Sequence, residues 1–202
     1  MPTEDTEHTE NGKNDGEFMH RNAVLILLRK HAERVADAHE AEMVAAAITF
    51  VETEVDCLER TCGPGHLTGS AWIVSPDRTR TLLTHHRKLG KWLQLGGHAD
   101  GDPDLLAVAL REAREESGLA NVRAVRAEIF DVDRHGIPAR KTEPGHDHYD
   151  LRFMIEADPH EPLVISSESK DLAWVEVSRV TSLNAEESMA RMVRKTAALR
   201  AE

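Results

Sequence analysis

Four charged residues near the middle of the chain have the types and spacing that divalent-cation chemistry requires. They are Arg111, Glu112, Glu115 and Glu116, within the segment 96–119, GGHADGDPDLLAVALREAREESGL. At helical spacing the three glutamates share one face, about a turn apart. Carboxylates crowded in this way repel one another, and near a helix C-terminus they also oppose the helix dipole. Arg111 neutralises part of this charge, and a cation with oxygen ligands would neutralise the rest.

The surrounding sequence places these residues on a helix that follows a glycine turn. Gly97 lets the backbone approach a ligand closely, Asp102 is the expected N-cap, Pro103 the first helical residue and Gly118 the C-terminal glycine. Such a turn and helix can hold Mg²⁺ or Mn²⁺ against phosphate oxygens, where the cation offsets phosphoryl charge and lowers the pKa of a bound water. The spacing alone also fits a Ca²⁺ site, a structural ion network or a solvated acidic face.

The same segment resembles the Nudix box, G-x5-E-x7-R-E-U-x-E-E-x-G-U, in which U is aliphatic. The matching positions are Gly97, Arg111, Glu112, Ala113, Glu115, Glu116, Gly118 and Leu119. One defining position differs, because Pro103 stands where the pattern has glutamate. The strands expected before and after the segment follow the order of that family, so the resemblance extends from residue 67 to about residue 177. The chain is thus similar to Nudix hydrolases of the MutT and ADP-ribose pyrophosphatase kinds.

The resemblance implies an α/β/α sandwich with a mixed β-sheet and hydrolysis of a phosphoanhydride bond in a nucleotide or nucleoside diphosphate derivative. It implies Mg²⁺ as the cofactor, with Mn²⁺ as an alternative. Glu115 and Glu116 resemble the principal metal ligands, and the carbonyl of Gly97 resembles a backbone ligand. Glu112 resembles a further ligand or the base that acts on metal-bound water. Arg111 resembles the family arginine that orients the glutamates.

Pro103 separates the competing interpretations. If the missing glutamate is peripheral, proline only rigidifies the helix start, and Asp100, Asp102 or Asp104 can supply the negative charge. If it is essential, the chain is a non-catalytic Nudix-fold module that binds nucleotides or regulates. A Ca²⁺-stabilised structural protein is a third interpretation. Retention of all three helix glutamates favours the enzyme.

Substrate-contacting residues are expected outside the helix. His98 directly follows Gly97 and is a candidate for a phosphate contact, while Glu168 and Glu143 are loop candidates for a catalytic base. Each is also compatible with a solvated polar residue. Other histidines could contact phosphates or a transition metal. Tryptophans could stack on a nucleobase, and basic loop residues could hold a phosphate. Ordinary structural roles explain all of these residues too. These are His85, His86, His146, His148, Trp72, Trp92, Trp174, Arg134, Arg140 and Lys141.

Periodicity divides the chain into three parts. Residues 1–17 are polar and acidic, and a disordered tail is expected. Residues 18–60 have the apolar period of a helical hairpin packed on the main domain. The resemblance implies a Nudix hydrolase domain over residues 61–202. The hairpin could be a dimer contact, a lid or simple packing, so a homodimer stays open. Strands are expected at 70–74, 81–84, 92–95, 122–132, 148–155 and 172–177, before a final helix from residue 184.

Composition narrows the class of partner. A net charge of −11 over 202 residues argues against binding to nucleic acid or an acidic membrane, so a small-molecule nucleotide is the expected partner. The longest apolar run, residues 43–51, is too short to span a bilayer, and no leader is evident. Cys57 and Cys62 are expected as reduced thiols in a cytoplasmic protein.

Overall fold

The computed structural model describes residues 8–140, 144–167 and 169–200, and within these residues an eight-stranded mixed sheet forms the centre of the fold. Strands β1 (Gly65–Val74) and β7 (His146–Glu156) pair in parallel along their shared length. The remaining pairs are antiparallel: β2 (Arg80–His86) with β1, with β3 (Trp92–Leu93) and with β8 (Ser169–Glu176); β4 (Leu95–His98) with β1; β5 (Arg123–Ala124) and β6 (Asp131–Ile137) with β7. The mixed sheet expected from the sequence is confirmed.

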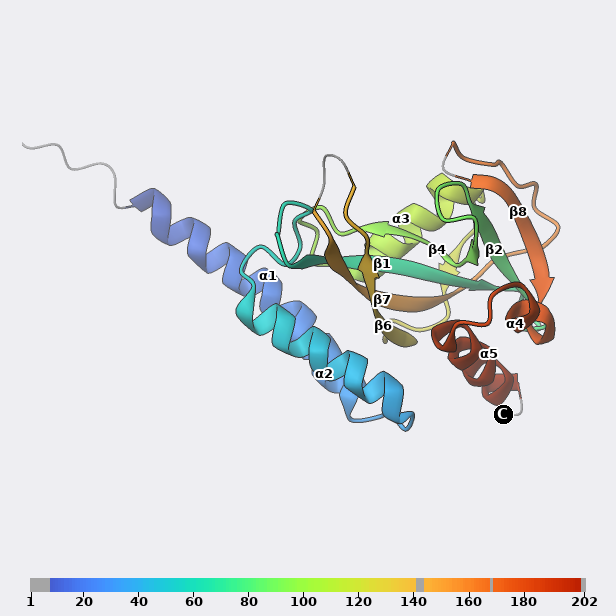
Figure 1. Cartoon of the computed structure of the whole chain (residues 1–202), viewed down its shortest axis with the longest axis horizontal. Coiled ribbons are helices and arrows are strands. Elements are labelled where there is room, and N and C mark those ends of the chain that lie inside the picture. Colours follow the sequence, from blue (N-terminus) through green and yellow to red (C-terminus); the bar gives the residue numbers. More distant parts are fainter. Residues whose placement is uncertain (1–7, 141–143, 168, 201–202) are drawn as a thin grey trace, which may run out of the picture.

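Helices cover both faces of this sheet (Figure 1). Alternate residues of a strand point to opposite faces, so β1 contributes to two cores. Leu67 and Ile73 belong to the core that contains α3 (Leu105–Ser117), whereas Trp72 and Val74 pack in the core that contains α5 (Glu187–Arg200). The short helices η1 (Val177–Arg179) and α4 (Val180–Leu183) connect β8 to α5. The expected α/β/α sandwich is therefore observed.

The expected N-terminal hairpin consists of α1 (His8–Ala32) and α2 (Ala38–Thr53), which lie side by side at one end of the sheet (Figure 1). Asp37 caps α2 by accepting a hydrogen bond from the backbone N–H of Glu40. The ring of Phe50 stacks on Tyr149 of β7 at a centroid distance of 4.1 Å, so α2 packs directly on the sheet. Residues 8–17 form the start of α1 and continue its helical hydrogen bonding, while the first part of the expected tail, residues 1–7, lies outside the described residues.

Three strand predictions were wrong. β1 begins at Gly65 rather than at residue 70, the strand expected over 92–95 is divided between β3 and β4, and the single strand expected over 122–132 is divided into β5 and β6. Cys57 and Cys62 are free and buried thiols, as expected. No helix in the described part of the chain is both long enough and apolar enough to cross a membrane.

Candidate metal and catalytic site

The glycine turn of β4 and the helix α3 are held tightly against β1. A Cβ at Gly69 of β1 would lie 2.7 Å from the carbonyl oxygen of Leu105 and 3.0 Å from Val108, so the helix packs where the strand has no side chain. Gly96 and Gly97 of β4 lie opposite Ser70 and Gly69, respectively, in the antiparallel pair. Because α3 and β4 both pack on β1, their positions relative to each other are fixed.

The start of α3 differs from the sequence prediction. The N-cap is Asp104, which accepts a hydrogen bond from the N–H of Ala107 at 3.0 Å, and Asp102 accepts from the N–H of Asp104 at 2.9 Å. The expected N-cap at Asp102 is thus wrong, and Pro103 lies before the helix rather than at its first position. Asp100 pairs with Arg60. All three aspartates flanking the missing glutamate are engaged in turn, capping or ion-pair contacts.

Two of the three glutamates converge on the glycine turn. The carboxylate of Glu112 lies so close to Gly97 that a Cβ at this glycine would be 2.5 to 2.7 Å from it. Glu116 accepts a hydrogen bond from the N–H of Gly96 at 3.2 Å and is 8% exposed. Glu115 has a 61% exposed side chain and lies toward solvent. Glu112 and Glu116 are therefore placed by the turn itself, whereas Glu115 is free to approach a ligand from outside.

Arg111 connects the glutamates to β4. Its Nη1 lies 2.8 Å from Glu112 Oε1 and 3.7 Å from Glu115 Oε2, and its Nη2 donates to the carbonyl of His98 at 3.3 Å. The guanidinium thereby compensates two carboxylates while it is anchored on the strand. This geometry agrees with an orienting role. The oxygen-rich donor set beside a closely approachable glycine backbone fits the preferences of Mg²⁺ or Mn²⁺.

Gly118 ends α3 as predicted. Its φ of 74° is in the left-handed region, and its N–H bonds to the carbonyl of Arg114. The apolar face of the helix packs on the sheet, with Val108, Ala109 and Ala113 buried, and this packing fixes the position of the glutamates relative to β1.

A histidine cluster lies beside the turn, and the sequence analysis named His98, His146 and His148 of it but not His66 or His135. His66 of β1 is directly opposite His148 of β7, which is in turn opposite His135 of β6, so the three rings form a row across the sheet. The ring of His98 is 4.8 Å from His66 and 5.1 Å from His148. His146 completes the cluster at 4.9 Å from His66. The alternation of His146 and His148 was visible in the sequence, but His66 joins them only through the parallel pairing of β1 with β7.

Burial changes the titration of this cluster. Desolvation, followed by the charge of His98, lowers the pKa of His66 to about 4. Desolvation and the charge of His66 lower the pKa of His148 to about 2. Both imidazoles are consequently neutral at ordinary pH, with a lone pair available on one ring nitrogen each.

Most of the remaining candidates have structural roles or lie outside the described residues. Trp72 is fully buried and donates to Thr196, and Trp92 stacks on His85 at 5.1 Å. Arg134 pairs with Asp147 at 2.9 Å. Glu143, Lys141 and Glu168 lie outside the described residues.

Comparison with known families decides the assignment. Residues 66–196, more than half of the chain, match the family model of the NUDIX domain. The chain belongs to the Nudix family. The match of this Nudix chain includes most of α5, whereas α1 and α2 lie outside it.

Solved structures support the Nudix fold. A Caenorhabditis elegans Ap4A hydrolase in a binary complex is similar with a TM-score of 0.55 at 16% identity, covering 67% of this chain and 97% of that chain. A Nudix-family hydrolase from Clostridium perfringens has a TM-score of 0.50 at 25% identity, covering 66% and 97%. The Escherichia coli dihydroneopterin triphosphate pyrophosphohydrolase has a TM-score of 0.51 at 14% identity, covering 64% and 92%. No curated protein sequence matches the chain significantly.

Proposed function

We propose that this Nudix protein hydrolyses a phosphoanhydride bond in a nucleotide or a nucleoside diphosphate derivative, with Mg²⁺ or Mn²⁺ as its cofactor. The observation that carries the proposal is the convergence of Glu112 and Glu116 on the Gly96–Gly97 turn, with Arg111 bound to Glu112. Membership of a family that contains hydrolases supports it. Oxygen donors and a backbone that approaches closely are what a small hard cation beside a phosphate requires.

Each residue of the site has a distinct part in this proposal. Glu116, Glu115 and the carbonyl of Gly97 would hold the cation, and Glu112 would be a further ligand or the base that accepts the proton of the attacking water. The bound cation would offset phosphoryl charge and make water acidic enough to attack near neutral pH. Arg111 would keep Glu112 oriented through its 2.8 Å contact. His98, adjacent to Gly97, would contact a phosphate of the substrate.

The test is a screen of the full chain against nucleoside triphosphates and nucleoside diphosphate-linked compounds with Mg²⁺, Mn²⁺ or Ca²⁺. We expect turnover with Mg²⁺ or Mn²⁺, and a fall in kcat/KM of about 100-fold or more in Glu116→Gln, because a buried charge that stabilises the transition state through the cation is lost. Glu42→Gln is the matched control, since Glu42 is an exposed helical glutamate of α2. It should retain the activity of the wild type.

The competing function is a nucleotide-binding or regulatory module, which Pro103 favours because it replaces a glutamate of the family pattern. A module of this kind would bind nucleotide without turnover and would keep its affinity in Glu116→Gln. Absence of turnover with every cation and substrate, together with such retained affinity, would overturn the hydrolase proposal. Thermal stabilisation by Ca²⁺ alone would instead support a structural ion site.

A further inference from the structure

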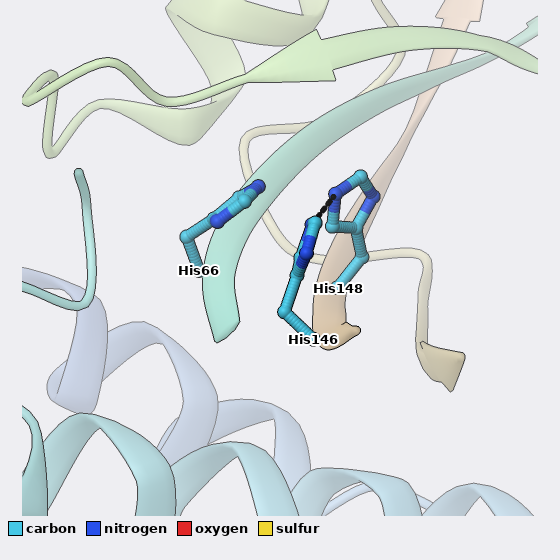
Figure 2. A group of neighbouring side chains, drawn as sticks. All are labelled: His66, His146 and His148. Carbon is cyan, nitrogen blue, oxygen red and sulfur yellow. Dashed lines mark hydrogen bonds between the residues drawn. The ribbon is translucent and has the colours of Figure 1, made fainter. Parts of the chain in front are cut away.

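Three histidines of the cluster lie on one face of two neighbouring strands. His66 of β1 is directly opposite His148 of β7, and His146 lies two residues earlier on the same face of β7. One donor nitrogen from each ring lies within 4.8 Å of the others. Figure 2 shows His66 projecting from β1 toward the two histidines of β7. Two parallel strands thus present three imidazoles to a common point.

His66 is the member whose polar atoms the fold leaves uncompensated. His66 is 1% exposed, and neither of its ring nitrogens has a hydrogen-bond partner among the described residues. Buried polar groups are nearly always paired with protein or water, so a buried imidazole with both nitrogens unpaired calls for a ligand. A cation that accepts a nitrogen lone pair would satisfy it.

His146 is already held as metal-ligating histidines are held. Its Nδ1 lies 3.0 Å from the carbonyl oxygen of Pro144, and because a carbonyl can only accept, this nitrogen carries the proton. The nitrogen left to bind a metal is therefore Nε2, which points toward His148. A histidine whose other nitrogen donates to a backbone carbonyl is oriented for metal binding through the free one.

The spacing of the two β7 histidines fits one shared ion. Their Nε2 atoms are 3.4 Å apart, as the dashed line in Figure 2 marks. Two nitrogens bound at ~2.05 Å to one tetrahedral Zn²⁺ are ~3.3 Å apart. The third nitrogen, from His66, lies within 4.8 Å of these two.

The ligand type distinguishes this cluster from the glutamate site. It contains three imidazoles and no carboxylate, so hard oxygen-seeking ions such as Mg²⁺ find no suitable donors. Zn²⁺ and neighbouring transition metals prefer neutral imidazole nitrogens. Three histidine ligands on a tetrahedral ion leave a fourth position for water or an anionic group.

We propose that His66, His146 and His148 form a second metal site, which takes Zn²⁺ or a similar transition-metal ion and is separate from the glutamate site on α3. The site has three protein ligands and one open position. His98 lies at its border, with its ring 4.8 Å from His66, and is also the residue that follows Gly97. The two sites consequently adjoin at β4, and an anion bound in the open position would lie beside the glycine turn.

The experiment measures Zn²⁺ binding to the full chain after removal of metals with a chelator, by competition with a chromophoric zinc indicator. We expect one tight equivalent in the wild type and a loss of affinity of at least about 100-fold in His66→Ala and in His146→Ala, because losing a direct ligand costs no less than losing an outer partner. Co²⁺ should give the visible absorption of a tetrahedral ion in the wild type, and this absorption should be lost in both variants.

Two controls separate this site from other binding. His160→Ala removes an exposed histidine and should bind Zn²⁺ as the wild type does. Glu116→Gln should also leave Zn²⁺ affinity unchanged, so the result does not depend on the proposed hydrolysis. His146 is only partly buried, and its variant remains informative if His66→Ala fails to fold. Absence of tight binding in the wild type, unchanged affinity in His146→Ala, or loss of affinity in Glu116→Gln would each overturn the proposal.

Discussion

Asp77, in the turn between β1 and β2, makes the stability of the protein depend on acid pH. Its carboxylate accepts from the hydroxyl of Ser75 at 2.6 Å and from the N–H of Thr79 at 3.1 Å. These hydrogen bonds lower the pKa of Asp77 from 3.8 to about 2. Because the folded pKa is lower than the unfolded one, the stabilisation is fully present above about pH 4 and is lost as the pH falls toward 2. Comparison of Asp77→Asn with the wild type isolates this effect.

We expect the wild type to melt at a higher temperature than Asp77→Asn at pH 6, and the difference to shrink as the pH falls below 4. Thermal melting followed by circular dichroism between pH 6 and pH 3 measures both quantities. Asp171→Asn serves as the matched control, because Asp171 also accepts a local backbone N–H. A difference that stays constant across this range would contradict the assigned titration.

Single residues of the site differ in how far the sequence could place them. Glu112 and Glu116 were found from spacing within one helix, since contacts three and four residues apart are local. His66 was not found, because its partners are about eighty positions away and meet it only through the register of β1 and β7. The capping role of Asp104 instead of Asp102 was missed because both residues are good caps and lie two positions apart.

At the scale of the element, Gly118 fixes how α3 ends and therefore where its last turn, with Glu116, lies. Its φ is 74°, and a Cβ there would be 2.6 Å from the Cβ of Val164 and 3.2 Å from the backbone nitrogen of Val164. Gly118→Ala should lower the free energy of unfolding by about 2 kcal/mol, since the left-handed conformation alone costs an alanine about 1–2 kcal/mol. Equilibrium unfolding in urea measures the loss.

Gly63→Ala is the matched control for this substitution. A Cβ at Gly63 meets nothing within 4 Å, and the φ of this glycine is not in the left-handed region. Its free energy of unfolding should be unchanged within about 0.5 kcal/mol or slightly raised. Equal losses in the two variants would show that Gly118 is not required at the end of α3.

The strand errors show what local sequence does not contain. Glycines at 63–69 were interpreted as a turn, yet Gly65 and Gly69 lie inside β1, where the backbone of Asp147 and the carbonyl of Leu105 approach too closely for a side chain. The division of the expected strand at 122–132 has a similar origin. Val125 bonds to Met154 and Phe130 to Arg152, so the chain advances five residues while its partner advances two. Only the register with β7 determines this interruption.

At the scale of the whole molecule, a network of buried charges joins the N-terminal hairpin to the family domain. Glu40 of α2 accepts from His31 of α1, from Lys195 of α5 and from the N–H of Val132 in β6. Burial opposes ionisation of Glu40, but hydrogen bonds from His31 and Lys195 lower its pKa below the ordinary value. The hairpin was predicted from its apolar period, whereas this attachment was not, because its partners are up to 155 positions apart.

Arg191 is the centre of that network on α5. It is 1% exposed and donates to both carboxylate oxygens of Asp131, at 2.7 and 2.8 Å, and to the carbonyl of Val132. Arg194, three residues later, has a 53% exposed side chain that pairs with Asp37 and Glu187. The two arginines thus offer a buried and an exposed ion pair on one helix.

Arg191→Met should lower the free energy of unfolding by about 3 kcal/mol, the lower end of the cost of breaking a buried pair, because Lys195 and Arg152 still compensate Asp131. Arg194→Met should cost less than about 1 kcal/mol, since solvent screens an exposed pair. Urea unfolding of both variants measures the two losses. Comparable losses would mean that the buried ion pair of Arg191 contributes no more to stability than the exposed pairs of Arg194.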